Sequence, residues 1–263
     1  MKLFQCTLLI SLLLALSSCE PAPAAAIMFD GTIFVDPDII TNTDPSMYSY
    51  LTPAGSANRQ MYDNRVNAWT EVKAVLFTAT YTNGRKIEMQ VNPEFGNGAA
   101  ARSQAEFYAK AIGLLPQPLL KDVLTVAIQK GNQAFGGGNS NLLIHTDRGA
   151  EYISQGILEE TLFHEAAHTS LDPYFLGSTD WSNAQSRDGR FISNYARQNP
   201  NREDIAESVL LYFGVTYRSQ RMDPMMVEAI KVTMPNRIDF FHALNLQPLT
   251  WEAVTEAMGA DAR

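Results

Sequence analysis

Apolar runs rich in β-prone residues precede the helical part of the chain. Runs at about 71–82 and 85–91 flank Asn83-Gly84, a dipeptide that tolerates the positive φ angles of a tight hairpin turn. The segments "DVLTVAIQKG" and "NLLIHTD" predict two further strands. We expect the glycine-rich "FGGGNS" between them to be a mobile loop beside a cleft.

Helical spacing of apolar residues dominates elsewhere. "AAARSQAEFYAKAIGLLP" predicts a helix that Gly113 and Pro116 end. Most of the remaining chain predicts helices, at about 155–171, 180–188, 202–217, 223–233 and 250–258. Strands followed by helices predict a single α+β domain at 60–263, with a mixed sheet in its N-terminal part. Residues 27–59 contain "DPD", "TDP" and "TPAGS", and this turn-rich pattern predicts an extended arm lying on the domain.

The first 26 residues have the three-part layout of a secretory leader. Lys2 precedes an apolar stretch from Leu8 to Leu16, which is too short to span a bilayer, and small residues follow. Leu16-Ser17-Ser18-Cys19 resembles a bacterial lipobox, in which Cys19 becomes the lipidated first residue. Cleavage near Ala24 or Ala26 is the alternative. Both alternatives predict a protein that is secreted or anchored to the cell envelope.

Cysteine content and charge narrow the function classes. Cys6 and Cys19 both lie in the leader, so the mature domain has no disulfide and no thiolate metal ligand. A net charge of -8 argues against nucleic acid and anionic membrane surfaces as partners, because both favour basic patches. We therefore expect membrane contact only through a lipid at Cys19. The sequence does not indicate an oligomeric state.

The stretch "EETLFHEAAHTSLDP" carries the strongest chemical signal. On a helix, His164 and His168 lie one turn apart and project from one face, so two imidazoles can meet a single ion. The carboxylate of Glu165 can reach a water bound to that ion without displacing it. This is why His-Glu-x-x-His recurs in hydrolytic zinc sites.

A hydrolytic zinc site also needs a third protein ligand. A metzincin would place it six residues after His168, where this chain has Tyr174, and Asp180 leaves little chain for a reversal. The segment "NREDIAESVLLYFG" is the better candidate, with Glu203 as ligand and Glu207 as hydrogen-bond acceptor for a ligating histidine. The alternative is that these acids only favour a helix N-terminus.

These motifs together resemble the gluzincin metallopeptidases. The segment "ISNYARQNPNREDIAESVLLYF" is most similar to the region around the third ligand in the catalytic domain of anthrax lethal factor and its relatives. That family has a tyrosine, a short polar link and Glu-x-x-Ala-Glu; here these places hold Tyr195, Gln198-Asn199 and Glu203 to Glu207. The link is one residue longer here, and the similarity covers about 155–215.

The resemblance implies a zincin-like fold and one zinc ion. Its zinc ligands would be His164, His168 and Glu203, with Glu165 as general base and Tyr195 as the hydroxyl that stabilises the oxyanion. The expected function is that of a zinc-dependent endopeptidase acting on a peptide or protein substrate. The strand at "NLLIHT" would align substrate by edge pairing, with His145 interpreted as a core residue. Two alternatives stay open: a catalytically silent zinc-binding or partner-binding envelope protein, and hydrolysis of another amide.

Overall fold

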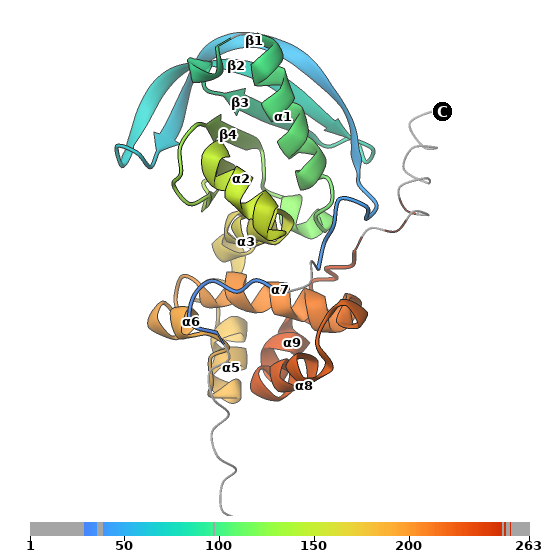
Figure 1. Cartoon of the computed structure of the whole chain (residues 1–263). Helices are drawn as coiled ribbons and strands as arrows, with labels where there is room; N and C mark the ends of the chain where they lie inside the picture. The colour runs from blue at the N-terminus through green and yellow to red at the C-terminus, as the bar shows by residue number, and fades with distance from the viewer. Residues whose placement is uncertain (1–28, 36–38, 97, 249, 251–252, 254–263) are drawn as a thin grey trace, which may run out of the picture.

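A six-stranded mixed sheet forms the N-terminal part of the described chain (Figure 1). The computed structural model describes residues 29–35, 39–96, 98–248, 250 and 253. The predicted leader at 1–26 and nearly all of the predicted helix at 250–258 lie outside these ranges. The strands are β1 (Tyr48–Asp63), β2 (Ala68–Tyr81), β3 (Lys86–Val91), β4 (Thr125–Gln129), β5 (Gly136–Gly138) and β6 (Asn141–His145).

The strand order is β1-β2-β3-β4-β6-β5. Strands β1, β2 and β3 pair antiparallel, β3, β4 and β6 pair parallel, and β5 runs antiparallel to β6. The predicted hairpin at Asn83-Gly84 joins β2 to β3, and Gly84 has a φ of +78° that a glycine adopts without strain. The predicted α+β class with an N-terminal mixed sheet is confirmed.

One long helix lies between β3 and β4 in the chain, and the other helices follow β6. The helices are α1 (Gly98–Ile112), α2 (Thr146–Gln155), α3 (Leu158–Ser170), α4 (Asp172–Phe175), α5 (Thr179–Asp188), α6 (Asn194–Gln198), α7 (Asp204–Tyr217), α8 (Pro224–Thr233) and α9 (Pro235–His242), with short 3-10 turns η1 (Pro93–Phe95), η2 (Gln117–Leu120) and η3 (Ser219–Arg221). In Figure 1, α1 and α2 lie beside the sheet, α7 crosses below α3, and α5, α8 and α9 form the far end. Among the described residues, no helix is long and apolar enough to cross a membrane.

Two boundaries differ from the sequence predictions. Residues 48–59 of the predicted arm belong to the 16-residue strand β1, which is an edge strand with most residues exposed on both faces. It therefore lacks the apolar alternation that marks a half-buried strand. The predicted helix at 155–171 begins later, because Gly156 adopts a left-handed conformation (φ 73°) that ends α2.

The described residues of the remaining arm, 29–35 and 39–47, are held by hydrogen bonds to α3 and α7. Glu160 of α3 is fully buried and accepts hydrogen bonds from the backbone N–H groups of Val35 (2.7 Å) and Ile39 (3.2 Å). Glu207 of α7 accepts one from the N–H of Ile33 (3.4 Å). Figure 1 shows this segment running along α7 toward α6. The arm therefore belongs to the folded core of the domain.

Candidate metal centre

Helix α3 presents the two histidines of the His-Glu-x-x-His motif on one face. Nε2 of His164 lies 3.1 Å from Nε2 of His168, although the two Cα positions are a full helical turn apart. Both side chains are largely buried, with relative exposures of 7% and 13%. The helical register therefore turns both Nε2 atoms toward one point, as the sequence spacing predicts.

Glu203 approaches this point from the start of α7. Its Oε2 lies 3.3 Å from Nε2 of His168 and 3.6 Å from Nε2 of His164, and its side chain is only 3% exposed. Its other oxygen, Oε1, pairs with the exposed Arg202 (3.1 Å). Glu203 is the residue that precedes the first turn of α7, and its carbonyl accepts the N–H of Glu207 (2.9 Å).

The three ligand atoms fit a single metal ion. Four-coordinate ions bind imidazole nitrogen and carboxylate oxygen at about 2 Å in a tetrahedral arrangement, which separates the ligand atoms by about 3.3 Å. The separations here are 3.1, 3.3 and 3.6 Å. His164, His168 and Glu203 therefore form a candidate metal-binding triad in the described part of the chain.

A carboxylate stands behind each histidine. Oδ2 of Asp172, one turn after His168, accepts a hydrogen bond from Nδ1 of that residue at 2.7 Å. Oε1 of Glu207 lies 3.7 Å from Nδ1 of His164, within ion-pair range, and its Oε2 accepts a hydrogen bond from Ser193 (3.0 Å). The hydrogen bond that Asp172 accepts from Nδ1 of His168 leaves Nε2 of that ring free to bind metal.

These contacts shift the charge states of the site. Burial opposes the carboxylate form of Glu203, but hydrogen bonds with both histidines outweigh burial and hold its pKa well below its usual range. Burial also disfavours protonated His168, yet hydrogen bonds with Asp172 and Glu203 raise its pKa to about 10. Burial raises the pKa of Glu207 to about 7. The carboxylate of Glu203 is therefore ionised, and a histidine binds a metal ion through a deprotonated ring nitrogen.

Asp172 was missed by the sequence interpretation, although its position four residues after His168 was a readable signal. Replacing Asp172 with alanine should weaken metal binding by about 10- to 100-fold, because His168 loses the partner that fixes its ring and tautomer. Competition with a metal-binding dye measures this change. Asp180, the exposed acid once considered as a ligand, provides the control, and a larger loss for Asp180→Ala would contradict the assignment.

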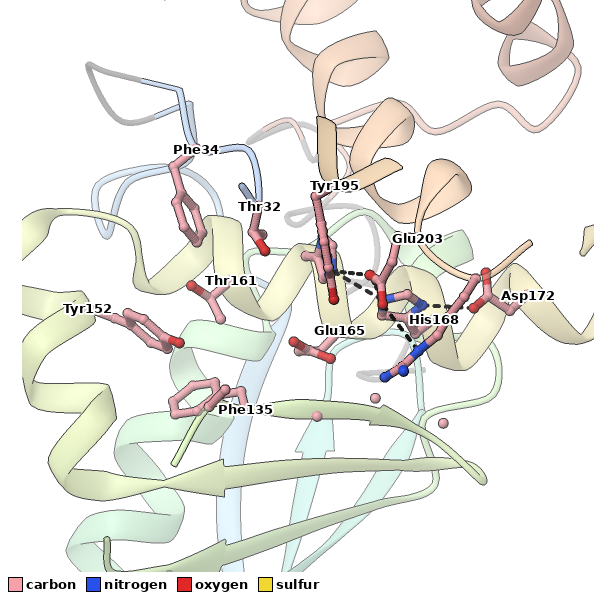
Figure 2. Close-up of a pocket in the computed structure, with 16 residues that line it drawn as sticks. Thr32, Phe34, Phe135, Tyr152, Thr161, Glu165, His168, Asp172, Tyr195 and Glu203 are labelled. Atoms are coloured by element: carbon pink, nitrogen blue, oxygen red, sulfur yellow. Dashed lines mark hydrogen bonds and ion pairs between the residues drawn. The ribbon is translucent and has the colours of Figure 1, made fainter. Parts of the chain in front are cut away.

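Glu165 and Tyr195 flank the triad in a cleft of ≈ 470 Å³ (Figure 2). Glu165 is half-buried, and in the figure its carboxylate lies between the triad and the aromatic residues at the other end of the cleft. Burial and the nearby carboxylate of Glu203 raise the pKa of the hydroxyl of Tyr195, on α6, to about 12. The phenol therefore stays protonated at neutral pH. The structure brings together all six residues predicted for the site.

The glycine-rich segment is an edge strand and not the predicted mobile loop. Strand β5 pairs with β6 on one side only, and Gly136, Gly137 and Gly138 line the cleft. Strand β6, predicted to align substrate, has partners on both sides and has no free edge. His145, at the end of β6, is fully buried, as interpreted from the sequence, and Lys130 O lies 3.1 Å from its Nδ1. The edge strand next to the triad is therefore β5.

Close contact with α3 explains the glycine at position 137. A Cβ at Gly137 would lie 1.9 Å from the carbonyl oxygen of Glu165, whereas a Cβ at Gly136 would come no closer than 3.6 Å to its neighbours. The hydroxyl of Thr169, on α3, also accepts the N–H of Gly138 (2.9 Å). Strand β5 and Glu165 are thus packed backbone to backbone.

Substituting Gly137 by alanine should destabilise the fold by about 1–3 kcal/mol, because β5 or α3 must move to admit the methyl group. Gly136→Ala is the matched control and should cost much less. Chemical unfolding of both variants measures the difference. Equal losses of unfolding free energy in the two variants would mean that Gly137 of β5 does not pack closely against α3.

Comparisons of this chain with protein-family models, curated proteins and solved structures gave no match. The case for a function therefore depends on the geometry of the site.

Proposed function

We propose that this protein is a zinc-dependent endopeptidase of the gluzincin type. The observation that carries the proposal is the convergence of two imidazoles and one carboxylate, from separate helices, at the base of a cleft that Glu165 also lines. A structural zinc site is closed by four protein ligands, whereas catalytic sites keep three and leave one position open. The described residues supply three.

Zinc is the ion that best fits this ligand set. Two imidazoles with one glutamate are a known set for catalytic zinc, and a site for magnesium or calcium would consist of oxygen ligands. The chain offers no cysteine outside its first 19 residues. When bound, zinc lowers the pKa of water and polarises a carbonyl group.

Two side chains would act on the peptide bond. Glu165 lines the cleft without joining the triad, so its carboxylate can accept a proton from water and deliver it to the leaving amine. The hydroxyl of Tyr195 remains protonated and can donate a hydrogen bond to the oxyanion that develops on the carbonyl. Asp172 and Glu207 would hold the rings of the two histidines.

The edge position of β5 supports a polypeptide substrate. Strand β5 has a paired strand on one side only and borders the cleft beside Glu165, so an extended peptide can pair with those outward-facing backbone groups that Thr169 does not already bind. Such pairing binds backbone in an extended conformation and aligns a scissile bond with the triad. The leader at 1–26 further supports action outside the cytoplasm, with or without a lipid at Cys19.

The direct test is incubation of the purified mature chain with a mixed proteome, followed by identification of new peptide termini. The proposal predicts new termini that a zinc chelator suppresses and added zinc restores. A protein that binds one zinc ion but produces no new termini would be the catalytically silent alternative. Release of products from cell-wall amides alone would identify a different amide substrate.

A further inference from the structure

Three aromatic side chains gather at the end of the cleft away from the triad. Phe34 comes from the arm, Phe135 from the residue before β5, and Tyr152 from α2 (Figure 2). The Phe135 and Tyr152 rings are 5.1 Å apart in an edge-to-face arrangement, and Phe34 lies 6.5 Å from Tyr152. In Figure 2, His168, Asp172 and Glu203 lie toward the other end, and Glu165 lies between the two groups.

The backbone of the arm fixes the direction of Phe34. Ile33 and Val35 are each 1% exposed, whereas Phe34 between them is only half-buried. Neighbouring side chains of an extended segment point to opposite sides, so burial of Ile33 and Val35 in the core turns Phe34 into the cleft. The N–H groups of Ile33 and Val35 are held by Glu207 and Glu160.

The partners of Phe34 are also held in place. Phe135 is 6% exposed and packs edge-to-face against Tyr108 of α1 (6.2 Å between centroids). Tyr152 packs against the main core of the domain. These two rings form a fixed floor, and Phe34 forms the facing wall. If Phe34 served only to pack the core, its ring would be buried there. Its ring is instead half-buried and lines the cleft.

We propose that this aromatic subsite, formed by Phe34, Phe135 and Tyr152, binds a large apolar side chain of an extended peptide, and that Phe34 makes the arm a specificity-determining part of the cleft. The inference rests on the proposed peptidase function, since it names the class of substrate. Binding a phenylalanine or leucine side chain here removes its apolar surface from water, whereas an aspartate would lose hydration without gaining a partner. The arm thus has two roles: it anchors Glu207 and it contacts substrate.

The test uses fluorescein-labelled eight-residue peptides of alanine and glycine with one central Phe, Leu or Asp. Binding is measured by anisotropy to the Glu165→Gln variant of the full mature chain, with and without zinc, and cleavage is measured with the wild-type protein. We expect the Phe and Leu peptides to bind roughly 10- to 100-fold more tightly than the Asp peptide. Adding Phe34→Ala should reduce that ratio about tenfold, and Phe34→Leu should retain most of it.

Phe107→Ala is the control, because Phe107 is an exposed aromatic residue on α1 that does not line this cleft. It should leave the ratio unchanged. Thermal unfolding reports whether each variant is folded. An equal binding ratio in the Glu165→Gln variant with and without Phe34→Ala, or no preference for apolar peptides, would overturn the inference even if cleavage occurs. A different outcome separates the two proposals. If Phe34→Ala removes the preference for apolar peptides but the wild-type protein cleaves none of them, the subsite is supported and the peptidase function is refuted.

Discussion

Replacing Glu165 with glutamine should lower the turnover of a cleaved peptide by about 10²- to 10⁴-fold. Glutamine has nearly the same shape but cannot accept and return a proton, so the loss measures general-base catalysis. Glu165 lies in the cleft but is not one of the triad residues, so the variant should keep its bound metal ion. Initial rates and elemental analysis of the same preparations measure both properties.

Glu159 offers a matched control. It lies on the same helix α3 but is not among the residues that line this cleft. Glu159→Gln should therefore turn over peptide at the rate of the wild type. A Glu165→Gln enzyme with unchanged turnover would remove this residue from the mechanism, whereas loss of metal from the variant would assign it a different role.

Replacing Glu203 with alanine should weaken metal binding by more than about 100-fold, which is the upper end of what loss of an outer-shell partner costs. Glu203 supplies the only carboxylate of the described triad, and its Oε2 is within 3.6 Å of both Nε2 atoms. The Glu203→Ala variant keeps the imidazoles of His164 and His168 as ligands but loses the negative charge that stabilises the metal ion.

Titration against a zinc chelator of known affinity measures that loss. Glu228→Ala is the control, because Glu228 is an exposed glutamate on α8 (73% side-chain exposure). It should bind metal as the wild type does. Equal affinities of Glu203→Ala and wild type would mean that the third ligand is elsewhere in the chain.

The local parts of the site could be predicted from the sequence. The spacing of His164 and His168 determines their common face on any helix, and the acidic start of α7 gives a carboxylate that can reach them. The position of Glu203 next to both imidazole rings depends on tertiary packing, which the spacing of residues in the sequence does not determine. Asp172 was equally local, since it follows His168 by one turn, but the sequence interpretation did not assign it a role.

The parts that were missed depend on long-range contacts. Strand β5 consists of three glycines, which have low strand propensity, and it forms because β6 and the backbone of α3 leave space for a strand without side chains. Strand β1 pairs along its length with β2 but exposes both faces, so it has no apolar alternation. Ile33, Phe34 and Val35 of the arm are all apolar, so the sequence does not show which of them face the core, and the partners Glu160 and Glu207 are more than 120 residues away in the chain.

Anomalous diffraction at the zinc absorption edge, from crystals of the purified mature chain, tests the central claim most directly. The account predicts one strong peak per chain, about 2.0–2.2 Å from Nε2 of His164, Nε2 of His168 and a carboxylate oxygen of Glu203. A zinc-soaked crystal without a peak at this point, or with a peak that Glu203 does not contact, would contradict it.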